Sequence, residues 1–161
     1  MSRISPFLWY DSEAEAAAQL YVSIFPNSKI TSVSRYGEAG PGKPGSAMTV
    51  SFELDGLPVT ALNGGPHFKL TEAFSMSVDC ADQTEVDRYW NALIEDGGQP
   101  SRCGWLKDRF GLSWQIVPRA LPRLLTDADR AKAQRVMAAM LKMSKLDVAQ
   151  LEAAAASSPP P

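Results

Sequence analysis

Apolar residues follow the same order of spacings in two separate stretches of the chain. The first stretch is an apolar run over 6–10 that leads into an Ala-rich segment over 12–25. The second is a run over 74–78 that leads into a segment over 82–96. Alternation over a few residues is typical of a half-buried strand, and apolar positions three and four apart are typical of an amphipathic helix. The pattern therefore predicts a strand followed by a helix in each half.

Equal spacings indicate that the two stretches are copies of one module. An aspartate follows each apolar run, and Asp11 precedes Tyr21 by the same distance along the chain as Asp79 precedes Tyr89. Repeated modules often place a shared site between them, so this repeat is the main organisational signal in the sequence. The apolar residues expected on the two helical faces are Ala17, Leu20, Tyr21, Ile24 and Phe25 in the first copy and Val86, Tyr89, Trp90, Leu93 and Ile94 in the second.

Strand-like segments follow each expected helix. Their β-branched and aromatic residues favour strands, and Asp55-Gly56, between the last two segments of the first half, is typical of a hairpin turn. The second half offers fewer such segments, so this copy looks shortened in its middle. The expected strands after the helices are 30–36, 47–54 and 58–62 in the first half and 99–106 and 113–117 in the second.

After the last of these strands the pattern changes to helix. Thr126 and Asp129 resemble a capping box ahead of an apolar stripe over 131–143. Ser144 and Asp147 can cap a further helical segment. The expected organisation is a single domain over 1–120, a helical extension over 121–156 and a disordered tail over 157–161.

Composition narrows the classes of protein without identifying one. A length of 161 residues with 45% hydrophobic residues is typical of one globular domain. The net charge of -2 lacks the basic excess that contacts with a phosphate backbone require. No apolar run approaches the roughly 20 residues of a membrane span, and the first residues do not resemble a secretory signal. We therefore expect a cytoplasmic protein without a nucleic-acid or membrane partner.

The single histidine limits the available mechanisms. His67 lies in a connector marked by Gly and Pro, where a histidine is usually a partly exposed loop residue, and a catalytic role is the alternative. With Cys80 and Cys103 as the remaining soft ligands, the chain offers no recognised zinc pattern. The Gly- and Pro-rich segment 37–46 lacks the glycine order of a phosphate cradle, which leaves a flexible loop or a lid over a pocket.

The segment around Cys103 is dense in chemically distinctive residues. Cys103 is either a buried thiol beside a core tryptophan or a thiol that faces a pocket with Trp105 as its apolar wall. Gln115 lies on a strand whose neighbours Trp114 and Ile116 point to the opposite side. Its amide either faces solvent or points into the interior of a curved sheet, where it would orient a ligand.

Four motifs give the chain a close resemblance to the PhnB-like branch of the vicinal oxygen chelate superfamily, which includes glyoxalase and bleomycin-resistance proteins. They are SPFLWYD with its Ala-rich helix, MTVSFELDG, TALNGGPHF and CGWLKDRFGLSWQIVP. The branch is often labelled 3-demethylubiquinone-9 3-methyltransferase. The resemblance covers Arg3 to Pro118 and implies an α+β fold of paired βαβββ modules, over 3–65 and 66–118, that form a cupped mixed sheet around a small-molecule pocket, commonly in a homodimer.

The methyltransferase label and the metal chemistry of the superfamily are two further implications of the resemblance. A cofactor-binding methyltransferase usually needs a Gly-rich turn between strand and helix in a doubly wound domain, and the chain has neither, so we treat the label as a name. By position, Gln115, Asn63 and Glu72 match three of the superfamily's metal ligands. The remaining position falls at Pro6 and Phe7, which cannot bind a metal. Two amides bring no charge to hold a divalent ion.

Two functions are therefore compatible with the sequence. In the first, the protein binds a small molecule in its cup, without metal or cofactor, and acts as a homodimer. In the second, it is a metal-dependent lyase, isomerase or dioxygenase in which Gln115 and Asn63, with Glu72 as a further candidate ligand, hold the ion. A structural dimer partner with a cup filled by its own side chains is a third reading. The residues expected to line the cup are Trp9, Asn63, Cys103, Trp105 and Gln115.

Overall fold

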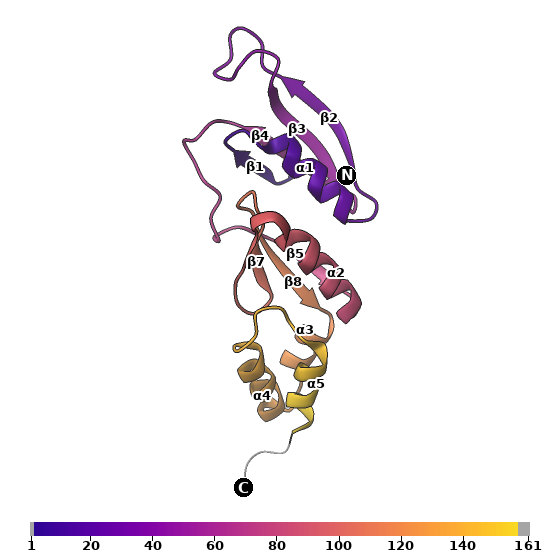
Figure 1. The fold of residues 1–161 in the computed structure, drawn as a ribbon. Coiled ribbons are helices and arrows are strands. Elements are labelled where there is room, and N and C mark those ends of the chain that lie inside the picture. Colours follow the sequence, from indigo (N-terminus) through magenta and orange to yellow (C-terminus); the bar gives the residue numbers. More distant parts are fainter. Residues whose placement is uncertain (1, 158–161) are drawn as a thin grey trace. The chain divides into compact units, whose positions relative to one another are not determined.

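Each half of the internal repeat folds as one βαβββ module in the computed structural model, which describes residues 2–157. The chain divides into a first unit, Met1–Thr71, and a second unit, Glu72–Pro161, and each contains one four-stranded mixed sheet (Figure 1). The α+β fold class is thus confirmed. Apart from Ser157, the expected tail over 157–161 lies outside the described residues.

The first unit packs one helix on one face of its sheet. Its elements are β1 (Phe7–Tyr10), α1 (Ala14–Ile24), β2 (Lys29–Arg35), β3 (Ala47–Leu54) and β4 (Leu57–Asn63). The strand order is β1-β4-β3-β2, with β1 parallel to β4 and the other pairs antiparallel. Ala17 and Tyr21 of the expected helical face are buried together with Phe52 of β3. Leu20 and Ile24 are half-buried, and Phe25 follows the end of the helix. The turn between β3 and β4 is the expected hairpin, since Asp55 and Gly56 both have positive φ.

The second unit repeats this order of strands. Its first elements are β5 (Ser75–Cys80), α2 (Gln83–Ile94), the short 3-10 helix η1 (Glu95–Gly97), β6 (Gln99–Pro100), β7 (Trp105–Lys107) and β8 (Ser113–Pro118). The order β5-β8-β7-β6 corresponds strand for strand to that of the first unit. Helix α2 buries Val86, Tyr89, Trp90 and Leu93 against the sheet, as its apolar spacing predicts.

The middle of the second copy is folded differently from the sequence-based expectation. The continuous strand expected over 99–106 is wrong, because the chain turns back at 101–104 and forms β6 and β7 as a hairpin. Cys103 and Gly104 have φ of 59° and 84°, which breaks the extended conformation. A Cβ on Gly104 would lie 2.8 Å from Leu146 Cδ1, so only glycine fits this turn. The second copy therefore has all four strands, and its short β6 and β7 explain why it looks shortened.

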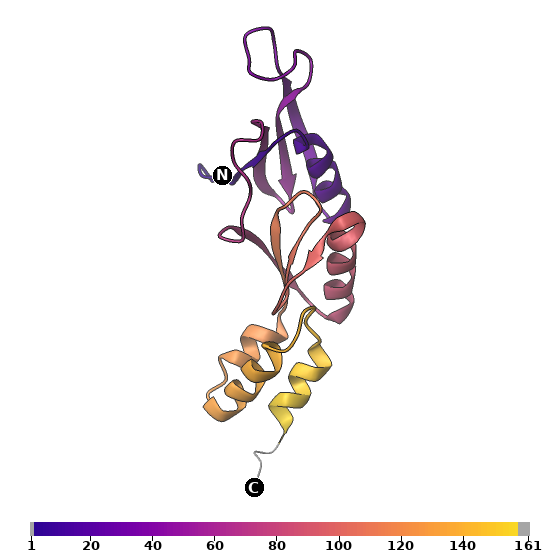
Figure 2. The ribbon, with the colours of Figure 1, turned by 60° about the vertical axis from the view of Figure 1, so that its left-hand side comes forward.

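Three helices end the described chain and belong to the second unit. They are α3 (Ala120–Leu125), α4 (Arg130–Met140) and α5 (Val148–Ala156), and Figure 2 shows them gathered beyond β8. Their common core contains Leu121, Leu124, Val136, Leu146 and Leu151. Among the described residues, none of the helices is long and apolar enough to cross a bilayer.

The caps of these helices correct two details of the sequence analysis. Asp129 alone caps α4, accepting hydrogen bonds from the backbone N–H groups of Ala131 and Lys132, whereas Thr126 ends α3. The expected capping box is therefore wrong. Asp147 caps α5 as expected, but Ser144 instead donates its hydroxyl to the Ser101 carbonyl.

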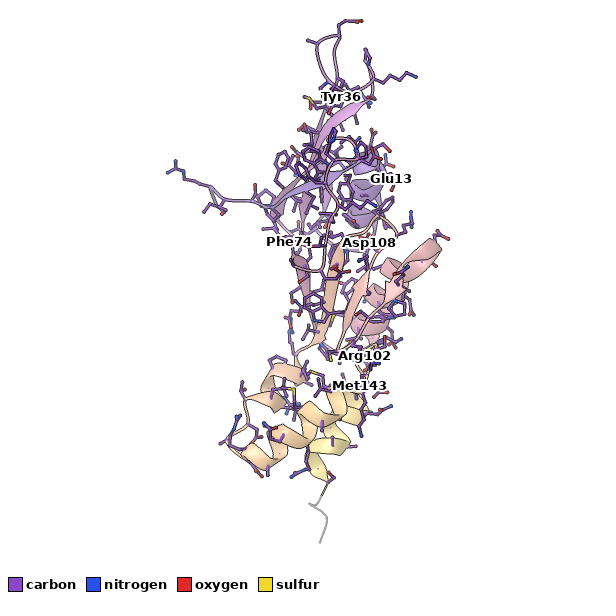
Figure 3. All side chains as sticks on the ribbon, turned by 90° about the vertical axis from the view of Figure 1, so that its left-hand side faces the viewer. Glu13, Tyr36, Phe74, Arg102, Asp108 and Met143 are labelled. Atoms are coloured by element: carbon purple, nitrogen blue, oxygen red, sulfur yellow. The ribbon has the colours of Figure 1, made fainter. Side chains whose placement is uncertain are left out.

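The chain segment between α4 and α5 is bonded to the β6–β7 turn. The backbone N–H of Cys103 donates to the Met143 carbonyl at 2.9 Å, and that of Gly104 donates to the Ser144 carbonyl at 2.8 Å. Figure 3 shows Arg102 and Met143 close together at this end of the unit. The C-terminal helices are thus hydrogen-bonded to the sheet that carries Trp105 and Gln115.

Asp108 fixes the turn that leads into β8. Its carboxylate is only 3% exposed, and it accepts hydrogen bonds from the backbone N–H groups of Phe110 and Leu112. Its second oxygen accepts a bond of 2.9 Å from Nε1 of Trp114. A buried carboxylate that accepts several N–H donors holds its surroundings firmly. The strand that carries Ser113 and Gln115 therefore starts from a fixed point.

Candidate functional site

One face of the second sheet is not covered by α2. Side chains alternate along a strand, and the alternation places Trp114 and Ile116 under the helix and their neighbours on the other side. We call this other side the open face of the second sheet. It is made by Ser75 and Ser77 of β5, Trp105 and Lys107 of β7, and Ser113 and Gln115 of β8.

The strand register arranges the open face in two rows. The first row crosses all four strands, and its successive partners are Gln99, Lys107, Ser113 and Ser75. The second row joins Trp105, Gln115 and Ser77. Directly opposite side chains on adjacent strands lie within contact distance of each other. Each row can therefore present several side chains to one small molecule.

Trp105 and Gln115 are brought together, as the sequence-based hypothesis requires. They are cross-strand partners, and both are partly exposed. Gln115 Nε2 donates to the hydroxyl of Ser75 at 2.9 Å, so one end of the amide is oriented by the sheet itself. An oriented amide beside an indole ring provides one polar and one apolar contact, which is the usual make-up of a small-molecule site.

A cavity of about 150 Å³ lies beside Trp105, and Gln115 is the cross-strand neighbour of Trp105 outside its lining. Lys107 and Glu72 form an ion pair at its border, and hydrogen bonding from the Lys107 ammonium holds the pKa of the Glu72 carboxyl below its usual value. Eight residues line the cavity: Glu72, Gln99, Pro100, Ser101, Trp105, Leu106, Lys107 and Ser113.

Ser113 is the polar group of this cavity that lacks a partner. Ser113 is only 1% exposed. Among the described residues, its Oγ is the buried side-chain atom that could form a hydrogen bond but has no partner. A buried hydroxyl without a partner is unfavourable and is usually explained by a water or ligand that completes it. The strand pattern that singles out Gln115 also selects Ser113, two residues earlier, but the sequence analysis did not treat it as a site residue.

Cys103 does not lie on the open face. It occupies the left-handed turn between β6 and β7, and its backbone is bonded to Met143 of the C-terminal helices. The thiol is partly exposed and free. The structure thus places Cys103 at the opposite end of the hairpin strand from Lys107, within the second unit.

Trp9 lies on the equivalent open face of the first sheet, where it is engaged by its own unit. Its Nε1 donates to the Gly65 carbonyl at 2.9 Å, and its ring meets Phe68 edge to face with centroids 4.9 Å apart. A Cβ on Gly64 would come within 2.3 Å of the same ring. The indole N–H is therefore already used, and the ring offers apolar surface only.

Asn63 uses both ends of its amide inside the first unit. Its Oδ1 accepts from the backbone N–H of Ala14 at 2.8 Å, which caps the start of α1, and its Nδ2 donates to the Ala47 carbonyl at 3.1 Å. Its backbone carbonyl accepts a hydrogen bond from the Tyr36 hydroxyl. These contacts give Asn63 a positioning role between helix, sheet and loop.

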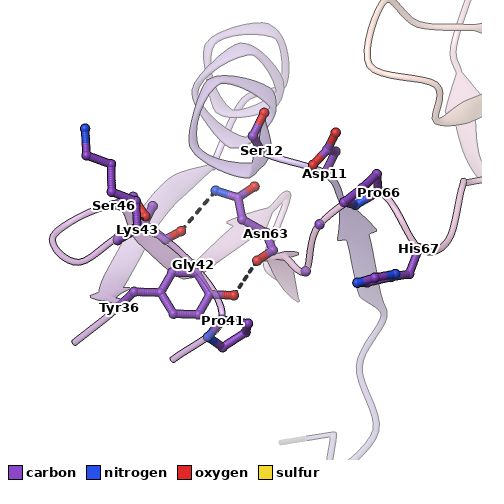
Figure 4. A pocket seen from close by; sticks show the side chains of 13 residues that line it. Asp11, Ser12, Tyr36, Pro41, Gly42, Lys43, Ser46, Asn63, Pro66 and His67 are labelled. Carbon is purple, nitrogen blue, oxygen red and sulfur yellow. Dashed lines mark hydrogen bonds between the residues drawn. The ribbon is translucent and has the colours of Figure 1, made fainter. Parts of the chain in front are cut away.

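A second cavity, of about 390 Å³, lies in the first unit beneath the segment 37–46 (Figure 4). Tyr36 supports this segment, because its ring packs under Gly40 and Gly42. The charged residues at the border are exposed, and the amine of Lys43 points away from Asn63 in Figure 4. The lining includes Asp11, Ser12, Tyr36, Lys43, Asn63 and His67. His67 is thus an exposed loop residue at the border of a wide depression.

Each residue proposed as a metal ligand is bonded within its own unit. The Asn63 amide is occupied at both ends, Glu72 is paired with Lys107, and Gln115 is bonded to Ser75. No cluster of three His, Cys, Asp or Glu side chains with metal-binding geometry exists in the part of the chain that the structure describes. Divalent ions of the hard type require several carboxylate or carbonyl oxygens.

Comparison with known proteins identifies related families and folds. A model of the family described as 3-demethylubiquinone-9 3-methyltransferase matches residues 2–117. The PhnB protein from Bacillus cereus, whose description carries the same methyltransferase name, is 33% identical. Its structure aligns with a TM-score of 0.67 and covers 73% of this chain and 99% of its own. No curated protein matches the chain.

Two more distant structures share the fold. Protein PA1353 from Pseudomonas aeruginosa is 19% identical, with a TM-score of 0.61, over 73% of this chain and 98% of its own. A mutant of the fosfomycin resistance protein FosX from Listeria monocytogenes, complexed with Mn(II) and 1S,2S-dihydroxypropylphosphonic acid, is 15% identical, with a TM-score of 0.50. That alignment covers 71% of this chain and 90% of FosX.

Proposed function

Because the chain belongs to the 3-demethylubiquinone-9 3-methyltransferase family, a PhnB-like branch with the vicinal oxygen chelate fold, we propose that it binds a small molecule on the open face of its second sheet. The binding needs no metal in this proposal. Trp105 provides an apolar wall, and Gln115 provides an oriented amide.

The cavity beside Trp105 is the observation that supports this function best. A hollowed sheet face on the side opposite α2, with one indole and a few fixed polar groups, has the composition of a small-molecule site. The cavity in the first unit is larger, but the charged residues at its border are exposed and the Asn63 amide is bonded at both ends. We therefore assign the ligand to the second sheet. The first cavity has a structural role in our proposal.

The family name does not describe the chemistry that we propose. A methyltransferase that binds a nucleotide-like methyl donor usually has a doubly wound parallel sheet with a Gly-rich first turn. Each sheet of this chain has one parallel and two antiparallel pairs. We expect S-adenosylmethionine to leave the melting temperature unchanged.

Binding can be tested by NMR on the indole N–H of Trp105. In ¹⁵N-labelled protein, we expect a panel of small dicarbonyls, hydroxy acids and their amides to include compounds that shift this signal saturably. Gln115→Ala should weaken the effect by about tenfold, since a hydrogen bond to an oriented amide is worth about 1 kcal/mol or slightly more. Gln150→Ala is the control, because this exposed glutamine forms its hydrogen bonds with Asp147. The absence of saturable shifts at Trp105 would contradict the proposal.

The metal-dependent alternative has a separate test. Protein purified without chelator or affinity tag should contain no stoichiometric metal by elemental mass spectrometry. Added nickel, zinc, manganese or iron should not raise its melting temperature. Near-stoichiometric metal that is lost in Gln115→Ala, with the circular dichroism spectrum unchanged, would overturn the metal-free proposal in favour of a lyase, isomerase or dioxygenase.

A further inference from the structure

The first row of the open face places a cation beside the buried hydroxyl. Lys107 and Ser113 are direct cross-strand partners, and both line the cavity of about 150 Å³. The side chain of Lys107 is 33% exposed, so much of it is held against the sheet. The hydroxyl of Ser113 lacks a protein partner among the described residues. An ammonium and a hydroxyl that converge on one small cavity can both donate to a single oxyanion.

Glu72 is the carboxylate that meets Lys107 in this structure. Glu72 precedes β5. Its side chain is 66% exposed, so it is surrounded by more solvent than the side chain of Lys107. An exposed ion pair of this kind is worth little in free energy, so it is readily exchanged. A ligand could therefore displace Glu72 from Lys107 easily.

We propose that Lys107 and Ser113 form a binding site for the carboxylate of a small ligand, and that Glu72 occupies Lys107 until such a ligand replaces it. This inference rests on the proposed function, since it names the ligand class of the same face. In the bound state the ammonium donates to one carboxylate oxygen and the Ser113 hydroxyl donates to the other or to the same one. Trp105 then covers the apolar part of the ligand.

The chemistry of the cavity favours a carboxylate over other charged groups. Lys107 is the single cation among the lining residues, which balances one negative charge. A phosphate dianion is usually held by several cations or by backbone N–H groups. A cationic ligand would have to pair with Glu72, but that carboxylate is the more exposed partner, while the buried side of the site offers Lys107 and a hydroxyl.

Matched acids and amides test the charge requirement. Benzoate with benzamide, and lactate with lactamide, are titrated into the full chain, and the Trp105 indole signal is followed by NMR. We expect at least one acid to bind about tenfold or more tightly than its amide, and Lys107→Gln to abolish that difference. Lys145→Gln is the matched control, because Lys145 pairs with Asp87 outside the cavity and is similarly exposed, at 35%.

Glu72→Gln tests the displacement directly. Removal of the competing carboxylate should tighten acid binding by up to about fivefold and leave amide binding unchanged, as expected for loss of an exposed ion pair. Glu152→Gln is the control, because Glu152 pairs with Arg123 outside the cavity. Weaker acid binding in Glu72→Gln would show that Glu72 contacts the ligand and would overturn its role as a displaceable occupant.

Ser113→Ala separates a binding role from a structural one. Removal of a buried hydroxyl that lacks a partner should raise the melting temperature of the ligand-free protein. The same change should weaken acid binding by about threefold to tenfold. Opposite effects on stability and affinity support the proposal, whereas unchanged acid affinity would remove Ser113 from the site.

The outcomes distinguish this inference from the function on which it rests. If amides shift Trp105 as strongly as acids, the carboxylate site is overturned while small-molecule binding stands. If an acid shifts Trp105 equally in the wild type and in Lys107→Gln, the assigned residues are wrong. If inorganic phosphate binds more tightly than every acid of the panel, the ligand class is wrong. If none of these probes shifts Trp105, both the inference and the proposed function are contradicted.

Discussion

Individual residues differ in whether their polar atoms are already used, and this difference separates structural from functional roles. Asn63 and Trp9 satisfy their polar side-chain atoms within the first unit. Gln115 has one amide end bonded to Ser75, and Ser113 has no partner in the described chain. The open face of the second sheet is therefore where polar side chains retain hydrogen-bonding capacity for a ligand.

The two cysteines should react very differently with alkylating reagents. Cys80 is fully buried, and desolvation, together with the charges of Glu85 and Asp79, raises the pKa of its thiol to about 12. The thiolate is the nucleophile, so iodoacetamide at pH 8 should label the partly exposed Cys103 and spare Cys80 until the protein unfolds. Peptide mass spectrometry measures both sites. Equal labelling in the native state would contradict the burial of Cys80.

The raised pKa of the Cys80 thiol also predicts how the free energy of unfolding changes in alkaline solution. The pKa of Cys80 is higher in the folded protein than its usual value of 9.0, so the folded state holds the proton more tightly. The resulting stabilisation is complete below about pH 9 and is lost as the pH rises towards 12. Urea unfolding should show a smaller alkaline loss of stability in Cys80→Ala than in the wild type. Cys103→Ser is the control and should follow the wild type.

At the scale of elements, the apolar periodicity of the sequence is sufficient to locate most strands and helices. The alternation around Trp114 and the helical stripe of Val86, Tyr89 and Trp90 appear in the structure as predicted. The β6–β7 turn has two left-handed residues, Cys103 and Gly104. Gly104 is a local turn signal, but a lone glycine is also compatible with a strand, and Cys103 is a type that seldom adopts this conformation. The packing of Gly104 against Leu146 depends on the tertiary structure, which the sequence does not show.

Part of the candidate site could be predicted from the alternation of side chains along the strands. Trp105 and Gln115 follow from strand parity and from the family motifs. Lys107 and Ser113 share that parity, but their pairing depends on the β7–β8 register and on the turn fixed by Asp108. The ion pair with Glu72 joins residues far apart in the sequence, so neither spacing nor charge pattern could locate it.

The cap on α1 provides a test of how the first unit is built. Asn63→Ala removes the acceptor for the Ala14 N–H and should lower the free energy of unfolding by about 1–2 kcal/mol, as loss of a helix cap does. Asn63→Asp keeps this acceptor but places a carboxylate oxygen against the Ala47 carbonyl, so it should also lower the free energy of unfolding. Urea unfolding followed by circular dichroism measures both changes. Equal stability of Asn63→Ala and the wild type would rule out this capping role.

At the scale of the whole molecule, the chain consists of two similar units, of which the second carries an additional helical core. That core is bonded to α2 through Gln83, which donates to the Leu146 carbonyl and accepts from the Val148 N–H. It is bonded to the β6–β7 turn through the backbone N–H groups of Cys103 and Gly104. The C-terminal helices thus support the hairpin that bears Trp105 and Lys107. Nothing equivalent follows the first sheet.

This arrangement predicts that the helical core contributes to the stability of the sheet. Leu146→Ala, at a fully buried position, should lower the free energy of unfolding by about 2–5 kcal/mol. Leu141→Ala is the matched control, since Leu141 is 55% exposed and its loss should cost less than about 0.5 kcal/mol. Near-ultraviolet circular dichroism, to which the buried Trp90 and Trp114 of the second unit contribute, reports on tertiary packing during urea unfolding. A transition unchanged by Leu146→Ala would show that the helices fold apart from the sheet.

The two-row register of the open face limits how such a protein can diversify. Exchange of a side chain at Trp105, Lys107 or Gln115, which are partly exposed, alters what the sheet presents while the core stays intact. Insertion or deletion of one residue in β7 would instead turn Leu106 outward and Trp105 and Lys107 towards α2. Selectivity can thus evolve by substitution at alternate positions, whereas the length of this strand is fixed. Libraries for a new binding preference should therefore vary these positions and keep the length of the chain unchanged.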